Sequence, residues 1–295
     1  MRVFVTGATG FIGSAVVREL LEQGHQVLGL TRSESGAATL TAAGAQVQRG
    51  DLEDLESLRT GAANADAVIH TAFVHDFNNF QKSCDIDLQA IETMVSVLEG
   101  SNRPFLVSTG SGLLPHGRVG TEEDAGGMHF PRVASDHATE AAAKRGVRSA
   151  IIRLPATVHG HGDHAFIPRI IDIARQKGVS AYVGNGENRW PAVHRLDAAR
   201  LYALAVEKVT PGARYHAIAE EGIPFRQIAE VIGRRLNLPT ASIPAEQAME
   251  HFGFFGLFAG ADLPVSSQLT QQRLGWRPTE RGLIADLDDT HYFQS

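Results

Sequence analysis

The feature that most constrains the fold is a glycine turn near the N-terminus. Residues 3–13, "VFVTGATGFIG", form a short apolar run, a turn with glycines spaced three apart, and the start of an amphipathic segment. Phosphate can approach a backbone only where side chains are absent, and a helix N-terminus offers free amides and a partial positive charge. Because the turn lies between a strand and a helix, we predict a dinucleotide site there and not a plain tight turn. The expected contact residues are Gly7, Thr9, Gly10, Phe11, Ile12 and Gly13.

Beyond this turn, the first half of the chain alternates two periodicities. Apolar segments at helical spacing, such as 11–20 and 86–98, lie between short β-rich runs. These runs are residues 3–6, 26–30, 45–48, 67–70, 105–108 and 150–154. Strands that alternate with helices predict an α/β fold, here a Rossmann-like doubly wound parallel sheet with right-handed crossovers. Such a sheet binds its ligands beyond the carboxyl ends of the strands.

The pattern loosens after Leu154, where Gly and Pro cluster. We predict a nucleotide-binding domain over residues 1–158, to which residues 192–218 return as a helix and a strand. Residues 159–191 and 219–295 are expected to form a smaller C-terminal substrate lobe. Its most apolar stretch, "HFGFFGLFAGAD", is interpreted as a lid or lobe contact, with membrane contact or a dimer patch as the other readings.

Composition excludes several classes of partner. The 33 acidic residues outnumber the 27 basic ones, and no Lys/Arg-rich block exists to bind nucleic acid. The single cysteine, Cys84, allows no intramolecular disulfide and no thiolate metal cluster. No apolar run approaches the ~20 residues that span a bilayer, and no signal-like segment precedes the first strand. We therefore expect a cytoplasmic protein with a small-molecule substrate, no membrane partner, and a homodimer as one possible assembly.

The end of the second strand bears on the choice of cofactor. An NAD site usually places a carboxylate there for the ribose hydroxyls, whereas an arginine suits the 2′-phosphate of NADP. The sequence has Thr31 in the acidic position, followed by Arg32 and Ser33. We predict NADP(H) in preference to NAD(H), with Arg32 as the contact; the alternative is a solvent-exposed loop arginine.

Further motifs follow in a fixed order: "GDLED", "VIHTAF", "VSTGSGLLPHG", "RLPATVHGHGD" and "GNGENRWPAVHRLDAARLYALA". Together with the glycine turn, they resemble the extended and atypical short-chain dehydrogenase/reductases, including the NAD-dependent epimerase/dehydratase group, over residues 1 to about 210. The resemblance implies that Asp51 and Leu52 contact the adenine. It also implies that Thr71, Ala72 and Phe73 line the ribose and pyrophosphate.

Catalysis in this family uses a Ser or Thr, a Tyr and a Lys. Fitting "RVASDHATE" to the family helix superposes Ser135 and Glu140 and places Arg132 at the Tyr position and Asp136 at the Lys position. The Ser position falls on a glycine, and the residues on either side of it are Thr109 and Ser111. The four tyrosines, at positions 182, 202, 215 and 292, all lie outside this helix.

These two replacements change the chemistry. A guanidinium does not release its proton near neutral pH, so Arg132 cannot act as an acid, although it could stabilise negative charge that develops on a carbonyl oxygen. Asp136 could accept hydrogen bonds from ribose hydroxyls but cannot lower a neighbouring pKa as a cation does. The alternative is that both are surface residues on a helix without a catalytic role.

The segment "HGHGDH", residues 159–164, spells a zinc-ligand pattern, but its flanks fit the reductase motif, and we predict no metal site. This segment should face the substrate. An imidazole titrates near operating pH, so His159 is a candidate general acid, with His161 as a substrate contact and His116 as a further candidate.

Two residues of the next motif are candidate substrate contacts. Arg189 falls where sugar-nucleotide enzymes of this type often hold a phosphate, and Trp190, with Tyr182 nearby, could form an apolar wall. His194 and Asp197 are expected to link the two lobes structurally.

The sequence thus favours an NADP(H)-dependent oxidoreductase that transfers hydride to or from a small carbonyl or unsaturated substrate without a catalytic Tyr. One alternative is a sugar-nucleotide-type epimerase or dehydratase, which would depend on the missing Tyr/Lys pair. The other is a non-catalytic NADP-binding regulatory module. The candidate catalytic residues are Thr109, Ser111, Arg132 and His159.

Overall fold

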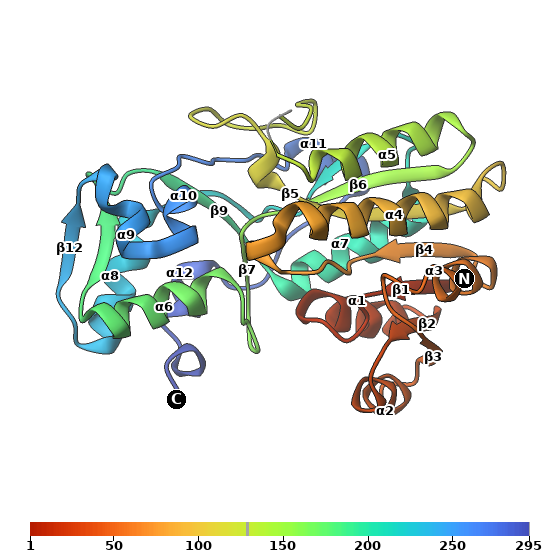
Figure 1. The fold of residues 1–295 in the computed structure, drawn as a ribbon, viewed down its shortest axis with the longest axis horizontal. Helices are drawn as coiled ribbons and strands as arrows, with labels where there is room; N and C mark the ends of the chain where they lie inside the picture. Colours follow the sequence, from red (N-terminus) through yellow and green to blue (C-terminus); the bar gives the residue numbers. More distant parts are fainter. Residues whose placement is uncertain (128–129, 295) are drawn as a thin grey trace.

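A seven-stranded sheet forms the body of the protein (Figure 1). The computed structural model describes residues 1–127 and 130–294. The strand order is β10-β6-β5-β4-β1-β2-β3, and every neighbouring pair is parallel, which confirms the predicted Rossmann-like doubly wound sheet. Its strands are β1 (Arg2–Thr6), β2 (Gln26–Thr31), β3 (Gln46–Arg49), β4 (Ala67–His70), β5 (Pro104–Gly110), β6 (Arg148–Leu154) and β10 (Arg214–His216).

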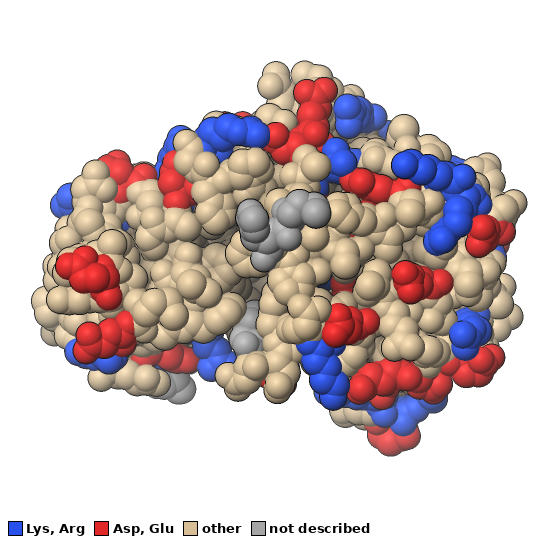
Figure 2. Space-filling view, turned by 45° about the horizontal axis from the view of Figure 1, so that its top comes forward, with Lys and Arg blue, Asp and Glu red and all other residues tan. Residues whose placement is uncertain are grey.

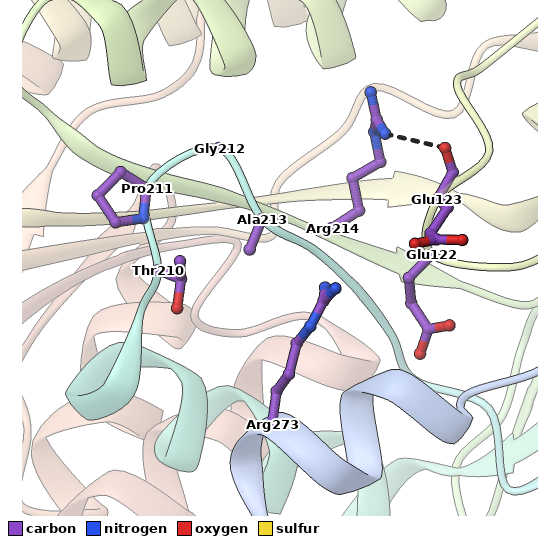
Figure 3. A pocket seen from close by; sticks show the side chains of 8 residues that line it. All are labelled: Glu122, Glu123, Thr210, Pro211, Gly212, Ala213, Arg214 and Arg273. Atoms are coloured by element: carbon purple, nitrogen blue, oxygen red, sulfur yellow. Dashed lines mark hydrogen bonds between the residues drawn. The ribbon is translucent and has the colours of Figure 1, made fainter.

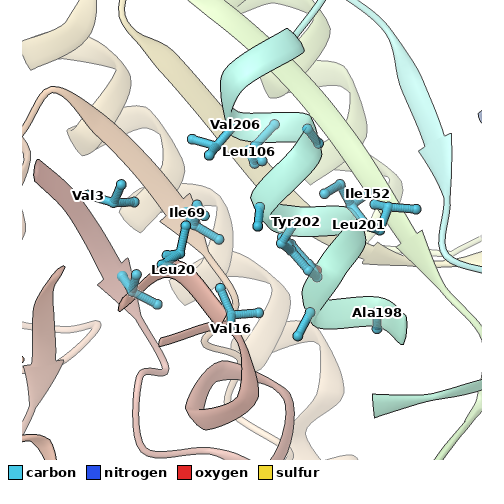
Figure 4. Packing of buried hydrophobic residues seen from close by; sticks show 14 of the residues in the cluster. Val3, Val16, Leu20, Ile69, Leu106, Ile152, Ala198, Leu201, Tyr202 and Val206 are labelled. Atoms are coloured by element: carbon cyan, nitrogen blue, oxygen red, sulfur yellow. The ribbon is translucent and has the colours of Figure 1, made fainter. Parts of the chain in front are cut away.

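Helices cover both faces of this sheet. On one face α1 (Phe11–Glu22) packs against α7 (Arg195–Lys208). Apolar residues four apart on these helices, such as Val16 and Leu20, meet the strand residues Val3 and Ile69 (Figure 4). The other face carries α3 (Leu55–Ala63), α4 (Phe80–Leu98) and α5 (Val133–Lys144) in sequence. The α2 helix (Glu34–Ala42) follows β2, and α11 (Gln268–Leu274) packs on α7.

The rest of the chain forms a lobe with its own core, on the left in Figure 1. Trp190 and Phe225 lie at its centre, with their ring centroids 4.8 Å apart. The strands of the lobe are β7 (Thr157–His159), β9 (Arg189–His194) and β11 (Glu220–Pro224) in one sheet, and β8 (Ser180–Val183) and β12 (Thr240–Ile243) in another. Its helices are α6 (Phe166–Lys177), α8 (Phe225–Leu236), α9 (Ala248–Phe252), α10 (Gly256–Ala259) and α12 (Leu283–Leu287).

Short 3-10 turns connect several of these elements: η1 (Phe77–Asn79), η2 (Ser111–Leu113), η3 (Ala245–Gln247), η4 (Gly253–Phe255) and η5 (Thr290–Tyr292). The apolar stretch at 251–262 spans α9, η4 and α10, and it packs into the core of the lobe. Residues 195–216 supply α7 and β10 to the sheet layer, while the exact division of the chain into domains remains a prediction. Among the described residues, no helix is both long and apolar enough to cross a membrane.

The order of the strands creates a switch point between β1 and β4. From β1 the chain winds outward through β2 and β3, and from β4 it winds the other way through β5, β6 and β10. Connections on opposite sides leave a crevice beyond the carboxyl ends of β1 and β4. The glycine turn follows β1 and the "HTAF" segment ends β4, so both predicted cofactor motifs meet at this crevice.

Candidate active site

The glycine turn has a geometry that excludes side chains. Gly7 has φ of +67°, and a Cβ there would lie 2.7 Å from the amide nitrogen of Ala72. A Cβ on Gly13 would collide with the carbonyl oxygen of Gly7. Gly10 precedes α1, and no side chain caps the amides of its first turn. The cradle and the uncapped helix start therefore fit the phosphates of a dinucleotide.

Gly13→Ala tests this cradle. We expect the added methyl to cost about 1–3 kcal/mol of folding stability, the usual penalty for overpacking, and to weaken dinucleotide binding more than tenfold because the turn must shift. Thermal unfolding and equilibrium dialysis with NADP+ would measure the two effects. Gly24→Ala is the control: Gly24 also has a positive φ, of +81°, but open space around it. It should lose stability and keep its dinucleotide affinity; equal affinity in both variants would contradict the assignment.

The structure brings the end of β4 against this turn. The Thr71 hydroxyl donates to the carbonyl of Thr6 over 2.7 Å, and a Cβ on Gly7 would meet both Thr71 and Ala72. The predicted contacts from the two motifs are therefore neighbours. Thr9 and Gly10 are exposed, and Phe11 and Ile12 are partly exposed at the start of α1.

A cluster of polar groups follows β2 and β3. The side chain of Arg32 is exposed and has no hydrogen-bond or ion-pair partner among the described residues. Ser33 caps α2 by accepting from the amide of Gly36 over 3.0 Å. Arg49, which sequence reasoning missed, ends β3, donates to the carbonyl of Ser33 over 2.7 Å and pairs with Glu34. Arg32, Arg49 and the capped N-terminus of α2 thus lie together beyond the ends of β2 and β3.

Asp51 and Leu52 lie just beyond β3. Asp51 is exposed and accepts hydrogen bonds from the amides of Glu53 (2.9 Å) and Asp54 (3.0 Å). Leu52 is buried at 8% exposure. Their predicted adenine contact remains a prediction, because their hydrogen bonds fix the loop and do not identify a ligand.

A buried polar network runs beneath the switch point. The Thr6 hydroxyl lies 2.7 Å from Nδ1 of His70, and Nε2 of His70 lies 3.1 Å from the carboxylate of Asp87 in α4. The hydroxyl of Ser135, in α5, donates to the other oxygen of Asp87 over 2.6 Å. The network ties the ends of β1 and β4 to the helices behind them. Sequence reasoning missed both His70 and Asp87.

Arg132 lies directly before α5 and borders this network at Asp87. Its guanidinium carbon lies 3.7 Å from the centre of the Phe73 ring, and Nη2 donates to the carbonyl of Ser108 over 3.0 Å. Its Nε is 3.8 Å from the carboxylate of Asp87. The side chain is 17% exposed, so the alternative of a surface arginine is wrong. Burial opposes ionisation of Asp87, yet its neighbours, Arg132 foremost, hold the pKa of this carboxyl below its usual range.

Two hydroxyl groups lie where β5 ends. Thr109 is 3% exposed and its Oγ1 has no hydrogen-bond partner, and Ser111 is 4% exposed at the start of η2. Arg132 contacts the carbonyl one residue before Thr109. The structure therefore brings together three of the four candidate catalytic positions.

Two further histidines reach this region. The ring of His75 lies 5.2 Å from the ring of Phe73, and desolvation, followed by the charge of Arg132, lowers its pKa. His164 packs edge-on against Phe11 at 5.8 Å, which brings the "HGHGDH" segment to the glycine turn. Sequence reasoning missed His75; its only signal is its position five residues after the end of β4.

His159 does not lie at the site. It is 1% exposed, and its Nδ1 lies 2.8 Å from the carboxylate of Asp286 in α12. This hydrogen bond holds the ring inside the lobe, and the role of His159 as general acid stays a prediction. His161 is exposed beside His291, with ring centroids 5.6 Å apart, and His116 is exposed beyond η2. No three His, Cys, Asp or Glu side chains in the described part of the chain converge as metal ligands would.

Asp136 also lies elsewhere than expected. It is 1% exposed and accepts a 2.7 Å hydrogen bond from Arg153, which is fully buried at the end of β6. Neither a ribose contact nor the alternative of a surface residue fits this position. The pair instead fixes α5 against the sheet.

The two candidates from the "NRWP" motif have structural roles. The guanidinium of Arg189 donates to both oxygens of Asp262, at 2.9 and 2.8 Å, so it is not free for a phosphate. Trp190 is 0% exposed, and its Nε1 donates to the carbonyl of Phe258 over 3.1 Å, so it supports the lobe and does not line a pocket.

None of the four tyrosine hydroxyls replaces the missing one on α5. Tyr202 is fully buried 2.5 Å from the Ser108 hydroxyl, and burial raises its pKa. Tyr292 donates to Asp163, and burial again raises its pKa. Tyr215 accepts from the amide of Thr210, and Tyr182 lies in β8 under Arg226.

A cavity of about 460 Å³ lies beside the edge strand β10, separated from β4 by β5 and β6. Figure 3 shows Arg273 reaching into it from α11. Most of its charged walls have internal partners: Arg214 pairs with Glu140, and Glu122 accepts from Thr270. It is not part of the crevice.

Comparison with known proteins agrees with this geometry. The sequence model of the NAD dependent epimerase/dehydratase family matches residues 3–218. The chain belongs to this family. An uncharacterized protein of Schizosaccharomyces pombe is 54% identical over 99% of the chain and 100% of its own length. A 2-alkyl-3-oxoalkanoate reductase of Stenotrophomonas maltophilia is 28% identical over 81% of the chain and 77% of its own.

Among solved structures, DesIV, a dTDP-glucose 4,6-dehydratase from Streptomyces venezuelae with NAD bound, superposes with a TM-score of 0.80. It is 20% identical and covers 99% of this chain and 97% of its own. This family member is an NAD(P)-dependent enzyme of the oxidoreductase type, and its cofactor is a nicotinamide dinucleotide.

Proposed function

We propose that this enzyme is an NADP(H)-dependent oxidoreductase of the atypical short-chain type, which transfers hydride to or from a small carbonyl or unsaturated substrate without a catalytic tyrosine. The observation that carries the proposal is the fixed position of Arg132 beside the ends of β4 and β5. At the position where relatives of this fold carry a proton donor, this chain holds a permanent cation.

The residues present fit the cofactor. Gly7, Gly10 and Gly13 leave room for the pyrophosphate at the start of α1, and Thr71 and Ala72 line the opposite side. Arg32, whose side chain has no partner among the described residues, would hold the 2′-phosphate, and Arg49 would support it through its hydrogen bond to the Arg32 carbonyl. The bound nicotinamide supplies or accepts the hydride.

Arg132 would bind the substrate oxygen. Nη2 and Nε are directed to Ser108 and Asp87, while Nη1 has no hydrogen-bond partner among the described residues. A free N–H on a cation that stacking on Phe73 holds in place can stabilise negative charge that develops on a carbonyl oxygen. Asp87 balances this charge within the protein, so the guanidinium can remain partly buried.

The proton would come from a group beside this oxygen. His75 lies next to Phe73 and its lowered pKa keeps it neutral at pH 7, so it can pass a proton inward from solvent while it stays uncharged. The hydroxyls of Thr109 and Ser111 at the end of β5 can hand a proton to the same oxygen. Desolvation, followed by the charge of Arg132, lowers the pKa of His75.

The similarity to a reductase of an oxoalkanoate supports the reductive direction. The family description also supports an epimerase or dehydratase as the second candidate. Such reactions oxidise the substrate first and rely on a Tyr that accepts a proton. Arg132 holds the position of that Tyr and cannot accept a proton, which places this candidate second.

The test is a screen of aldehydes, ketones and activated alkenes in which NADPH oxidation is followed at 340 nm. We expect turnover of carbonyl compounds. Tight NADPH binding together with no turnover of any member, and capture of one specific protein partner, would favour the regulatory module instead.

Cofactor preference gives a second test. Because hydrogen bonds to charged groups are the stronger ones, Arg32→Ala should weaken NADPH binding roughly 10- to 100-fold and leave NADH binding unchanged. Arg49→Ala should have a smaller effect on NADPH, because Arg49 is already paired with Glu34. Fluorescence titration with both nucleotides would measure this. Arg18→Ala, on the exposed face of α1, is the control. Equal affinities for NADPH and NADH in wild type and all variants would exclude a 2′-phosphate site here.

A further inference from the structure

We propose that the substrate of this site is an uncharged carbonyl compound with apolar substituents, and that nucleotide sugars are excluded. This inference rests on the proposed function and specifies its substrate class. Three observations carry it: an aromatic wall on the lobe, the contact of this wall with the end of β5, and the pairing of Arg189 with Asp262.

The wall is formed by Phe166, Phe254, Phe255 and Phe258. Its ring centroids lie 5.0 Å apart for Phe166 and Phe255, 5.6 Å for Phe166 and Phe258, and 5.8 Å for Phe254 and Phe258. All four side chains are only partly buried. Leu257, between them, is 57% exposed, so apolar surface continues out to solvent. Partly exposed aromatic rings beside an exposed leucine can bind an apolar ligand or partner, and we assign them to the substrate.

The aromatic wall meets the reactive end of the sheet domain. A Cβ on Gly112 would lie 4.0 Å from Cε1 of Phe258, so the wall reaches η2, directly beyond β5. Backbone hydrogen bonds from Gly117 to Asp262 (2.9 Å) and from Gly120 to Pro264 (2.8 Å) fix the two segments to each other. A molecule whose oxygen faces Arg132 and the hydroxyls of β5 would therefore place its other end against phenylalanine rings.

Charge supports the same substrate class. Asp262 accepts from the backbone amide of Arg189 at 2.8 Å as well as from its guanidinium, and the bonds to Arg189 hold the pKa of Asp262 below its usual value. The pair is a net neutral unit. In Figure 2 the lobe on the left is mostly tan, and its charged side chains lie toward its outer edges.

A diphosphate brings two negative charges that must be hydrogen-bonded or paired when they leave water. In the lobe, a diphosphate would meet phenylalanine rings and Arg189, whose guanidinium is already hydrogen-bonded to both oxygens of Asp262. An apolar ketone loses no such hydration, and its hydrocarbon surface leaves water on contact with the wall. The lobe therefore discriminates against nucleotide sugars and in favour of apolar carbonyl compounds.

The experiment measures binding apart from turnover. Protein saturated with NADP+ cannot reduce a ketone, so calorimetric titration with 4-phenyl-2-butanone and, separately, with UDP-glucose reports affinity alone. We expect saturable binding of the ketone and at least tenfold weaker binding of UDP-glucose. Phe258→Ala and the milder Phe258→Leu should weaken ketone binding, the former tenfold or more. Phe293→Ala, a partly buried phenylalanine packed against Arg235 in the same lobe, is the matched control.

Melting temperatures of all variants identify any that fail to fold, and the wild-type comparison of the two ligands does not depend on them. Tighter binding of UDP-glucose than of the ketone, no ketone binding, or ketone binding that Phe258→Leu and Phe293→Ala affect equally would overturn the inference. Ketone binding in the expected pattern with no reduction by NADPH would instead overturn the proposed function. Reduction of only small polar aldehydes would leave the function and overturn the substrate class.

Discussion

Arg132→Ala is expected to lower kcat/KM for carbonyl reduction by about two to three orders of magnitude, the usual cost of removing a group that stabilises a developing oxyanion. NADPH affinity should change much less, because the proposed pyrophosphate and 2′-phosphate contacts lie at α1 and at the ends of β2 and β3. The loss should appear mainly in kcat, since the interaction strengthens only as charge develops on the oxygen.

The control is Arg132→Lys, which keeps a cation but loses the planar group that stacks on Phe73 and donates to Ser108. We expect it to recover part of the activity and not all of it. Steady-state kinetics at several pH values would add a second readout. The pKa of His75 is lowered partly by Arg132, so removing that charge should shift any limb of the pH profile due to His75 to higher pH. Unchanged kinetics in both variants would mean that this residue only supports the fold.

The sheet was predictable from sequence because its signals are local. A strand, a glycine turn and an apolar stripe at helical spacing each lie within about ten residues, and their alternation determines a parallel α/β fold. The strand 67–70 has the predicted bounds. Boundaries moved in β5, which extends from Pro104 to Gly110 and not only over 105–108, because burial continues from Pro104 to Thr109.

The partners of polar side chains were not predictable in the same way. Arg189 pairs with a carboxylate 73 positions later in the chain, and His159 with one 127 positions later. Such pairs depend on the path of the loops that return to the site, which no local periodicity encodes. A motif therefore predicted which residue types are present but not whether each one is free to bind a ligand.

Asp87 shows the same limit for a residue that no motif singled out. The stretch "CDIDLQAI" in α4 contains two aspartates, two positions apart. Asp85 is exposed and accepts from Gln81 one turn earlier, whereas Asp87 is fully buried beneath the ends of β1 and β4. Residues two apart on a helix point to nearly opposite sides, so periodicity places Asp87 on the side of the buried Ile91 and Met94, but it identifies no partner for the carboxylate. Only the packing of α4 against α5 does so, because Ser135 in α5 and Arg132, directly before it, approach Asp87.

Asp87→Ala is expected to have the largest effect on stability, a loss of about 3–5 kcal/mol at pH 7, the range for breaking a buried charged pair. The substitution leaves the buried groups of His70 and Ser135 without their acceptor and removes the counter-charge of Arg132. Chemical denaturation would measure the free energy of unfolding. Asp85→Asn on the same helix is the control and should stay within about 0.5 kcal/mol of wild type.

The pH dependence separates the charge of Asp87 from its shape. Its pKa is lowered in the folded state, so its ionisation contributes stability above the unfolded value of about 3.9. That contribution is lost as the pH falls from about 5 toward the lower folded pKa. Asp87→Asn keeps the shape without the charge, so the stability gap between it and wild type should be largest at pH 7 and should close in acid. A gap that is constant with pH would show that the hydrogen bonds matter and the charge does not.

A double-mutant cycle connects the two substitutions. If Asp87 stabilises the protein partly as the counter-charge of Arg132, then Asp87→Asn and Arg132→Ala should cost less together than the sum of the two single losses. Coupling of about 1 kcal/mol or more would show that the network holds the guanidinium in position, since Nε lies only 3.8 Å from the carboxylate. Strict additivity would assign Asp87 to the fold and leave Phe73 and the carbonyl of Ser108 as the groups that position Arg132.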